Sequence, residues 1–307
     1  MGSIYQKKTQ FLNPGKEFCQ QDKSKIVVLP FPLEQTTSYM KGTVLGPEAI
    51  VEASCQVEFF DPELKFEARK NGIYTDWSIG DPEINKLNIE EILKKANTAV
   101  QKYLDEDRFI LTLGGEHTII AGIFDPFAKK YKGDLTVVHL DAHSDLKDEY
   151  EGTPYSHASA IRRIYKKAPI LAAGIRSVDQ EEFALGRNEH IHTYYAHEME
   201  DSTWVKDLVS RIKTQYVYFT IDLDGLDPSI MPSVGTPEPG GILWPELMGL
   251  LRGVSANHKI IGADVNELRP IPNFVSSDFI AAKLCYKIMG FAMKSQNLGI
   301  VEKFAGK

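Results

Sequence analysis

The chain has 307 residues, of which 43% are hydrophobic and 25% charged, and its formal net charge is −7 at pH 7. The hydrophobic fraction excludes a disordered chain, and no uncharged apolar run approaches the roughly 18 residues that a membrane-spanning helix needs. The acidic balance argues against a nucleic-acid partner, and the start of the chain lacks the apolar stretch of a secretory signal.

Short apolar segments alternate along the chain with amphipathic ones. The apolar segments predict strands buried on both faces of a sheet; in chain order they are Lys25–Leu29, Gly72–Thr75, Phe109–Leu113, Leu135–Leu140, Ile170–Gly174, Ile191–Tyr195, Tyr216–Ile221 and Ile260–Val265. Apolar residues at helical spacing predict helices; these are Pro47–Val57, Asn88–Glu106, Thr118–Lys130, Ser159–Lys167, Trp204–Lys213, Pro245–Val254 and Ser277–Met293.

The repeated strand–helix order predicts an α/β protein with one parallel sheet covered by helices on both faces. We expect residues 1–24 to form a polar N-terminal segment that wraps the surface or is mobile, followed by a single domain at 25–307. The three cysteines, Cys19, Cys55 and Cys285, are too widely spaced for a disulfide framework and predict a reducing, cytoplasmic location. Cys55 and Cys285 lie in apolar segments and are expected to be packing residues.

Residues with chemically active side chains directly follow several of the predicted strands. Ligands of an open parallel sheet bind beyond the carboxyl ends of its strands, so these residues are expected to meet there. Two of the segments carry these residues two positions apart: Asp141, His143 and Asp145 in one, and Asp222 and Asp224 in the other. Residues two positions apart place their side chains on the same side of an extended segment. The set comprises four aspartates and two histidines: His117, Asp141, His143, Asp145, Asp222 and Asp224.

This set predicts two divalent metal ions. It exceeds the four ligands, often Cys and His, of a structural zinc site, and it suits two ions about 3.5–4 Å apart with bridging carboxylates. The oxygen-rich donors favour Mn²⁺. Four carboxylates balance the charge of two such ions, so the site should accept a neutral or cationic electrophile. Two-metal sites also lower the pKa of bound water, which makes hydroxide available near neutral pH.

Each motif taken alone has another interpretation. Asp141–Asp145 taken alone could be a turn with a capping aspartate. The loop that begins at Asp222 resembles a calcium loop, but it has Gly225 at position 4 and Ser233 at position 12, where the EF-hand pattern requires Gly at position 6 and Glu at position 12. His139 lies within a predicted core strand and is expected to be a hydrogen-bonded packing residue.

Taken together, the motifs resemble those of the ureohydrolases, the arginase and agmatinase family of dinuclear manganese enzymes, and are closest to bacterial-type agmatinases. The matching segments are Gly114–His117, Asp141–Asp145, Asp222–Pro228 and Gly235–Gly241, with Pro30–Tyr39, Gly46–Ile50 and Asp264–Glu267 extending the match over most of the chain. The resemblance implies a three-layer α/β/α fold with an eight-stranded parallel sheet. It also implies hydrolysis of a guanidino group to urea and an amine by a homo-oligomer, trimeric or hexameric.

The resemblance also implies roles for single residues. By motif position, the four aspartates and two histidines match the family's manganese ligands, and Asp145 also matches the residue that holds the proton of the attacking hydroxide. Glu267 matches the glutamate that binds the substrate guanidinium. His157 matches the histidine that shuttles protons, a role suited to a side chain that titrates near neutral pH. The alternative, taken without the family, is a surface histidine in the loop Tyr155–Ser159.

The expected substrate is agmatine, a small cationic guanidino compound whose hydrolysis gives putrescine for polyamine biosynthesis. Arginases carry an Asn two residues after the aspartate–histidine motif, whereas this chain has Lys147 there, followed by an acidic loop that favours a positively charged tail. Lys147 could also contact a carboxylate, which leaves an arginase or a guanidinobutyrase open, and Ser156–Ser159 departs from the His-Gly-Thr of well-known agmatinases. Two alternatives from other classes are a catalytically dead metal-binding subunit and a zinc amide hydrolase of the deacetylase type.

Overall fold

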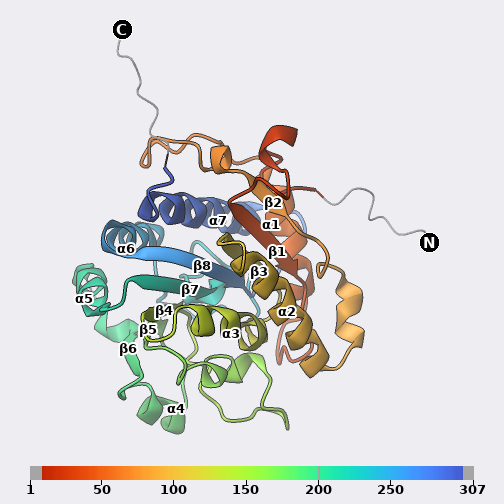
Figure 1. Ribbon diagram of the computed structural model, residues 1–307. Coiled ribbons are helices and arrows are strands. Elements are labelled where there is room, and N and C mark those ends of the chain that lie inside the picture. The colour runs from red at the N-terminus through yellow and green to blue at the C-terminus, as the bar shows by residue number, and fades with distance from the viewer. Residues whose placement is uncertain (1–8, 200, 300–307) are drawn as a thin grey trace.

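The computed structural model describes residues 9–199 and 201–299. Its centre is one eight-stranded parallel sheet with the strand order β2-β1-β3-β8-β7-β4-β5-β6 (Figure 1). All eight predicted strands are confirmed to within two residues at either end. Their bounds are β1 Ile26–Phe31, β2 Ile73–Thr75, β3 Phe109–Gly114, β4 Leu135–Leu140, β5 Ile170–Ile175, β6 Ile191–Tyr195, β7 Tyr216–Asp222 and β8 Lys259–Asn266.

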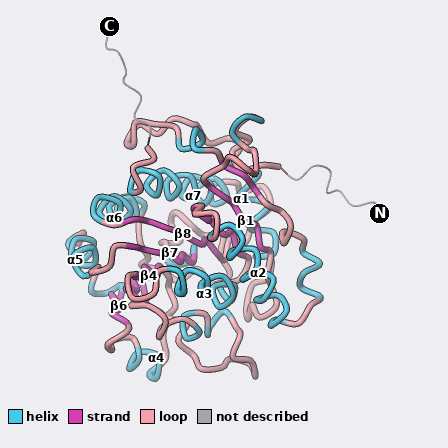
Figure 2. Tube along the Cα trace, in the orientation of Figure 1, coloured by secondary structure: helices cyan, strands magenta, loops and turns pink. Residues whose placement is uncertain are grey.

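Helices cover both faces of the sheet, which gives the expected three layers (Figure 2). The α-helices are α1 Gly46–Ser54, α2 Ile89–Leu104, α3 Ile120–Lys130, α4 Gln180–Leu185, α5 Thr203–Arg211, α6 Trp244–Asn257 and α7 Ser276–Ser295. Helix α7 packs against α1 and α6, and α6 packs against α5, whereas α2 and α3 pack against each other. Two separate hydrophobic clusters follow from this arrangement, one on each face of the sheet.

The strands are buried along nearly their whole length, because both sheet faces are covered. In β3, β4 and β5 every residue is buried, as expected for continuous apolar runs in a parallel sheet. The described part of the N-terminal segment packs against this body: Phe11 and Leu12 are 0% and 1% exposed. Their backbone N–H groups donate to Thr75 Oγ1 at 2.8 Å and Ser54 Oγ at 2.6 Å. Residues 1–8 lie outside the described residues.

One predicted helix was wrong. Ser159–Lys167 forms no α-helix; two short 3₁₀ turns, His157–Ser159 and Ile161–Arg163, stand near its start. A helix would need the N–H of Arg162 to donate to the carbonyl of Ala158. Instead the N–H of Arg162 donates to the carbonyl of Asp145 at 2.9 Å, and the carbonyl of Ala158 accepts from Lys147 N–H at 3.1 Å. The backbone groups of this segment therefore form hydrogen bonds with the loop after β4 and not with one another, as they would in a helix.

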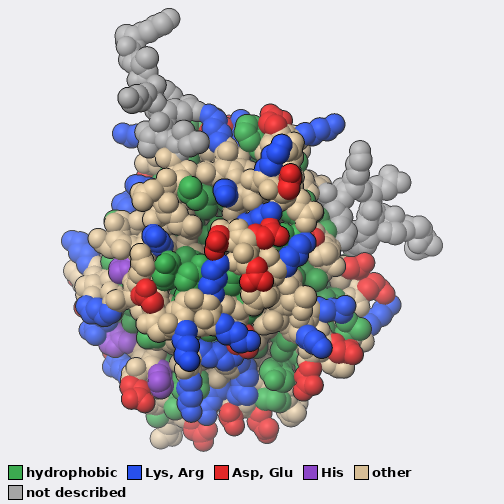
Figure 3. Space-filling model, in the orientation of Figure 1, with side chains coloured by type: hydrophobic (Ala, Val, Ile, Leu, Met, Phe, Trp, Pro, Cys, Tyr) green, Lys and Arg blue, Asp and Glu red, His purple; other side chains and the backbone are tan. Residues whose placement is uncertain are grey.

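The four central strands β3, β8, β7 and β4 bring their carboxyl ends to one edge of the sheet. The loop after β3 closely approaches the loop after the neighbouring strand β1: a Cβ atom on Gly115 would lie 2.1 Å from the carbonyl oxygen of Leu33, so only glycine fits there. Among the described residues no helix combines the length and apolar character needed to cross a membrane. Acidic and basic side chains are interspersed on the face drawn in Figure 3.

Candidate functional site

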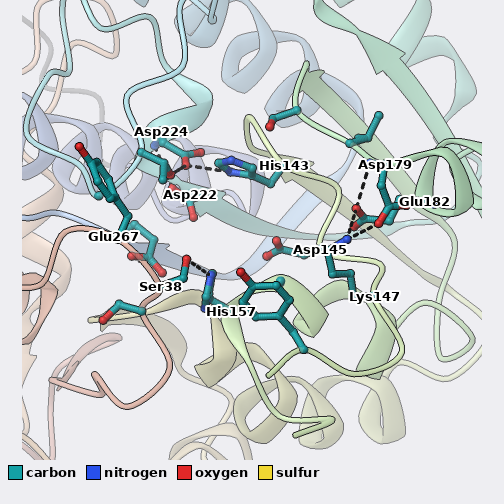
Figure 4. A pocket seen from close by; sticks show the side chains of 18 of the residues that line it. Ser38, His143, Asp145, Lys147, His157, Asp179, Glu182, Asp222, Asp224 and Glu267 are labelled. Atoms are coloured by element: carbon teal, nitrogen blue, oxygen red, sulfur yellow. Dashed lines mark hydrogen bonds and ion pairs between the residues drawn. The ribbon is translucent and has the colours of Figure 1, made fainter. Parts of the chain in front are cut away.

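A cavity of about 390 Å³ opens at the carboxyl ends of the central strands. Its walls come from the loops after β1, β4, β5, β7 and β8 (Figure 4). The predicted site residues that line it are His143, Asp145, His157, Asp222, Asp224 and Glu267. The other two, His117 and Asp141, are 0% exposed and contact members of this set. All eight predicted site residues are therefore brought into one region.

His117 gathers three of the aspartates around one ring nitrogen. Its Nδ1 atom lies 3.1 Å from Asp141 Oδ2, 3.1 Å from Asp145 Oδ2 and 3.7 Å from Asp222 Oδ2. The opposite ring nitrogen, Nε2, lies 2.7 Å from Thr220 Oγ1, which in turn donates to Asp264 Oδ1 at 2.8 Å. Since the threonine proton goes to the carboxylate, the threonine oxygen accepts from Nε2–H, and Nδ1 is the ring nitrogen that faces the aspartate cluster and would bind a cation placed between them.

His143 forms the second half of the cluster. Its Nδ1 atom lies 3.0 Å from Asp224 Oδ2 and 3.6 Å from Asp141 Oδ1. Asp141 therefore faces His117 with one oxygen and His143 with the other, the arrangement of a carboxylate shared between two positions. His139, the predicted packing residue, is fully buried, and its Nε2 atom lies 2.9 Å from Asp141 Oδ2.

The donor set fits two divalent cations. Burial raises the pKa of Asp222 well above its ordinary value, and the neighbouring carboxylates of Asp224 and Asp141 raise it further, which is the crowding of anions that a bound cation relieves. The Asp264–Thr220–His117 chain fixes the ring nitrogen that faces the cluster, as supporting hydrogen bonds do for metal-binding histidines. Two groups of side chains are suited to a metal, and Asp141 belongs to both: His117, His139 and Asp141 form one, and Asp141, His143 and Asp224 form the other.

Two of the site residues have left-handed backbone conformations. The φ angle is 53° at Asp145 and 67° at Glu267. Non-glycine residues rarely adopt positive φ, and such strain concentrates where a side chain must be aimed by the surrounding structure. At Asp145 the conformation is held by the hydrogen bond from Arg162 N–H, and at Glu267 by a backbone N–H bond of 2.7 Å to the carbonyl of Gly115. Both strained residues line the cavity.

Glu267 presents a carboxylate to the cavity next to the aspartate cluster. It is 9% exposed, and its Oε1 atom accepts a 2.7 Å hydrogen bond from the backbone N–H of His117. Burial raises the pKa of Glu267 well above its ordinary value, and the charge of Glu116 adds to the rise. A cationic ligand beside Glu267 would offset this penalty, because an opposite charge favours the ionised carboxylate.

His157 lies on the other side of the cavity, in the short 3₁₀ turn His157–Ser159. Its Nδ1 atom lies 3.3 Å from Thr36 Oγ1, and its Nε2 atom lies 3.3 Å from Ser38 Oγ (Figure 4). Its ring meets that of Tyr150 edge-on at a centroid distance of 5.6 Å. His157 is therefore a fixed wall residue of the cavity and not a free surface histidine. Thr36 was not singled out from the sequence, although it lies within the matching segment Pro30–Tyr39.

Lys147 is engaged by carboxylates of its own chain. Its ammonium pairs with Asp179 and lies 3.2 Å from Glu182 Oε2 (Figure 4). The interpretation of Lys147 as a free contact for a substrate carboxylate is therefore not supported by its surroundings. Asp179 and Glu182 were missed because helix α4 was not predicted. Their signal was present as a capping box, in which an N-terminal Asp is followed three residues later by Glu.

Known proteins resemble this chain over most of its length. The model of the Arginase family matches residues 24–290. The chain is 37% identical over 297 residues to N(1)-aminopropylagmatine ureohydrolase from Synechocystis sp., covering 94% of this chain and 97% of that protein. It is 34% identical over 276 residues to agmatinase from Bacillus cereus, covering 87% and 93%. The proclavaminate amidino hydrolase from Streptomyces clavuligerus superposes with a TM-score of 0.81 at 23% identity, covering 96% and 100%, and shows the same fold. The chain belongs to the arginase family.

Proposed function

We propose that this arginase-family hydrolase cleaves the guanidino group of agmatine to urea and putrescine, using two Mn²⁺ ions. The observation that carries the proposal is that Glu267 lines one cavity with His143 and three of the aspartates, while His117 and Asp141 are buried in contact with this set. The proposed metal-binding residues are His117, Asp141, His143, Asp145, Asp222 and Asp224. When bound, two divalent ions lower the pKa of water and so supply a nucleophile at neutral pH.

The chain's own residues then bind and orient the substrate. Glu267 accepts hydrogen bonds from the planar guanidinium, and such charge-assisted pairs are strong and directional. Asp145, held in its left-handed conformation, is aimed at the centre of the cluster and is expected to accept the proton of the attacking water oxygen. His157, across the cavity, is placed to give a proton to the departing amine nitrogen.

Charge at the cavity wall supports a cationic substrate. If the four aspartates of the cluster balance two divalent ions, the wall still carries the carboxylates of Glu267, Asp179 and Glu182 against the single ammonium of Lys147. A substrate with a positive tail is attracted by this excess, whereas the carboxylates of arginine and 4-guanidinobutyrate are repelled. Lys147 does not reverse the balance, because its ammonium is already paired.

A second candidate substrate is N(1)-aminopropylagmatine, the compound that appears in the name of the relative from Synechocystis sp.. It carries one amine more than agmatine. The cavity extends from Glu267 past the aspartate cluster to Asp179, whose side chain is about half exposed. A longer polyamine tail therefore has both room and a carboxylate at the outer end of the cavity.

The test is a substrate panel with the Mn²⁺-loaded protein. We expect kcat/KM, scored by released urea, to be higher for agmatine or N(1)-aminopropylagmatine than for arginine, 4-guanidinobutyrate or guanidine. An arginine value above both amines would contradict the proposed substrate class. Absence of urea from all five compounds would instead favour a catalytically dead subunit, and one metal per chain by elemental analysis would favour the zinc amide hydrolase.

A further inference from the structure

Glu116 is a fully buried carboxylate that the proposed reaction does not use. It lies at 0% exposure, one residue before His117. Its Oε2 atom accepts the backbone N–H groups of Gln35 at 2.8 Å and Thr36 at 2.7 Å, and its Oε1 atom accepts the hydroxyl of Thr36 at 2.9 Å. Three hydrogen bonds therefore fasten the loop after β1 to the end of β3.

The hydrogen bonds around Thr36 determine where its neighbours carry protons. A carboxylate that already accepts backbone N–H groups takes the hydroxyl proton of Thr36. The Thr36 oxygen is then an acceptor toward His157, whose backbone N–H donates to it at 3.1 Å and whose Nδ1 atom lies 3.3 Å away. The same oxygen also lies 3.4 Å from Thr118 Oγ1. A neutral imidazole that hydrogen-bonds to this acceptor oxygen does so through a proton on Nδ1. Its Nε2 atom is left as the acceptor, next to the hydroxyl of Ser38 at 3.3 Å.

We propose that Thr36 is a positioning residue that acts through His157: anchored by Glu116, it fixes the Nδ1-protonated tautomer and so keeps Nε2 as the nitrogen that gains and gives the reaction proton. The proposal rests on the assignment of His157 as the proton donor in the proposed function. In the transfer, the proton leaves Nε2 for the departing amine nitrogen, and the ring returns to the neutral form with its Nδ1 proton still bonded to Thr36.

A second carboxylate–threonine–histidine series of hydrogen bonds occurs in the same site. Asp264 accepts from Thr220, which in turn faces His117 Nε2 at 2.7 Å. In both series of hydrogen bonds, Asp264–Thr220–His117 and Glu116–Thr36–His157, a buried carboxylate accepts the threonine proton, so the hydroxyl oxygen becomes an acceptor for one histidine nitrogen. The two series select opposite ring nitrogens. Nδ1 of His117 is freed for the aspartate cluster, and Nε2 of His157 is freed on the cavity side.

A double-mutant cycle tests whether Thr36 acts through His157. Thr36→Val removes the hydroxyl at nearly constant volume and should lower kcat about tenfold with little change in KM, whereas Thr36→Ser should restore most of the loss. In a His157→Asn background, Thr36→Val should change kcat less than about twofold. An equal loss in both backgrounds would overturn the proposal and assign Thr36 a merely structural role. Thr98→Val, exposed on α2, controls for the substitution itself.

A second measurement does not depend on turnover. Nitrogen-15 spectra of histidine-labelled protein, loaded with diamagnetic Mg²⁺, distinguish the two neutral tautomers, and the His157→Asn spectrum identifies the signal of His157. We expect an Nδ1-protonated ring in the unaltered protein and in Thr36→Ser, and loss of this preference in Thr36→Val. An Nε2-protonated ring in the unaltered protein overturns the proposal, even if the substrate panel yields urea. If the panel yields no urea, the proposed function fails, but the nitrogen-15 spectra still determine the tautomer of His157.

Discussion

The backbone N–H of His117 donates a 2.7 Å hydrogen bond to Oε1 of Glu267. These two residues lie 150 positions apart in the chain and follow neighbouring strands, β3 and β8. The same contact therefore sets the distance between the proposed guanidinium anchor and the aspartate–histidine cluster. It also leaves Oε2 of Glu267 without that backbone donor, so the second oxygen has capacity for a cationic ligand.

Glu267→Gln tests the anchor without changing its shape. The amide keeps an oxygen for the His117 N–H but loses the negative charge that pairs with a guanidinium. We expect kcat/KM to fall by at least about 100-fold, since a hydrogen bond to a charged group is worth about 1.5–3 kcal/mol and two are at stake. Metal content by elemental analysis should remain that of the unaltered protein. Near-normal turnover would show that the anchor is wrong, and loss of metal would assign Glu267 to the metal site.

Asp224→Ala tests the metal site with a readout other than activity. Asp224 Oδ2 lies 3.0 Å from His143 Nδ1, and Asp224 Oδ1 accepts the backbone N–H of Ala142 at 3.0 Å. We expect less Mn²⁺ per chain after dialysis, together with a smaller rise in melting temperature on addition of Mn²⁺, because a ligand that binds more weakly stabilises the fold less at the same concentration. Glu238→Gln in the same loop is the matched control. Unchanged metal content in Asp224→Ala would remove this residue from the cluster.

The fold and the cluster could be predicted because their signals are local. Apolar runs marked all eight strands, and parallel strands bring the residues after their carboxyl ends together. The spacing of Asp141, His143 and Asp145 could therefore be interpreted before any geometry was known. Helix α4 was missed because it has only six residues and its start signal, Asp179 with Glu182, was not used.

What the sequence could not predict depends on contacts between distant segments. The helix expected at Ser159–Lys167 has the apolar pattern of a helix, but Asp145 and Lys147 take the backbone groups that a helical ladder would use. The relation of Thr36 to His157 spans 121 positions and carries no periodic signal. The pairing of Lys147 with Glu182 likewise requires the fold. The homo-oligomer, by contrast, stays a prediction from the family resemblance.

Lys147→Met tests the charge at the outer end of the cavity. Burial lowers the pKa of Lys147, but Asp179 and Glu182 outweigh this effect, so the pKa is raised and the group stays charged. Its removal frees two carboxylates toward the cavity. We expect KM for N(1)-aminopropylagmatine to fall about fivefold more than KM for agmatine, the effect of one charge several ångströms away at an effective dielectric of about 40. The exposed Lys132→Met is the control, and equal changes for both amines would refute a direct role of this charge.

A buried ion pair far from the cavity gives a prediction about stability. Lys287 in α7 is 8% exposed and contacts Asp61, itself 2% exposed, at 2.9 Å. Burial raises the pKa of Asp61, but the hydrogen bond from Lys287 and backbone N–H groups lower it more, so the net pKa is below its ordinary value. A carboxylate with a lowered folded-state pKa stabilises the fold above its unfolded pKa, near 4, and this stabilisation is lost as the pH falls through the folded value.

Lys287→Met should therefore lower the free energy of unfolding by about 3 kcal/mol at pH 7, because it leaves Asp61 buried without its cation. The difference from the unaltered protein should shrink below about pH 4, where protonation of Asp61 removes the unpaired buried charge in the variant and the Asp61–Lys287 pair in the original. The ammonium of Lys287 also contacts Glu63 Oε2 at 2.8 Å. Urea unfolding at pH 7 and pH 3.5 measures both values. Lys294→Met, exposed near the end of the same helix, should leave the free energy within about 0.5 kcal/mol. An equal loss for Lys287→Met at both pH values would mean that packing of the lysine stem, and not its charge, stabilises α7.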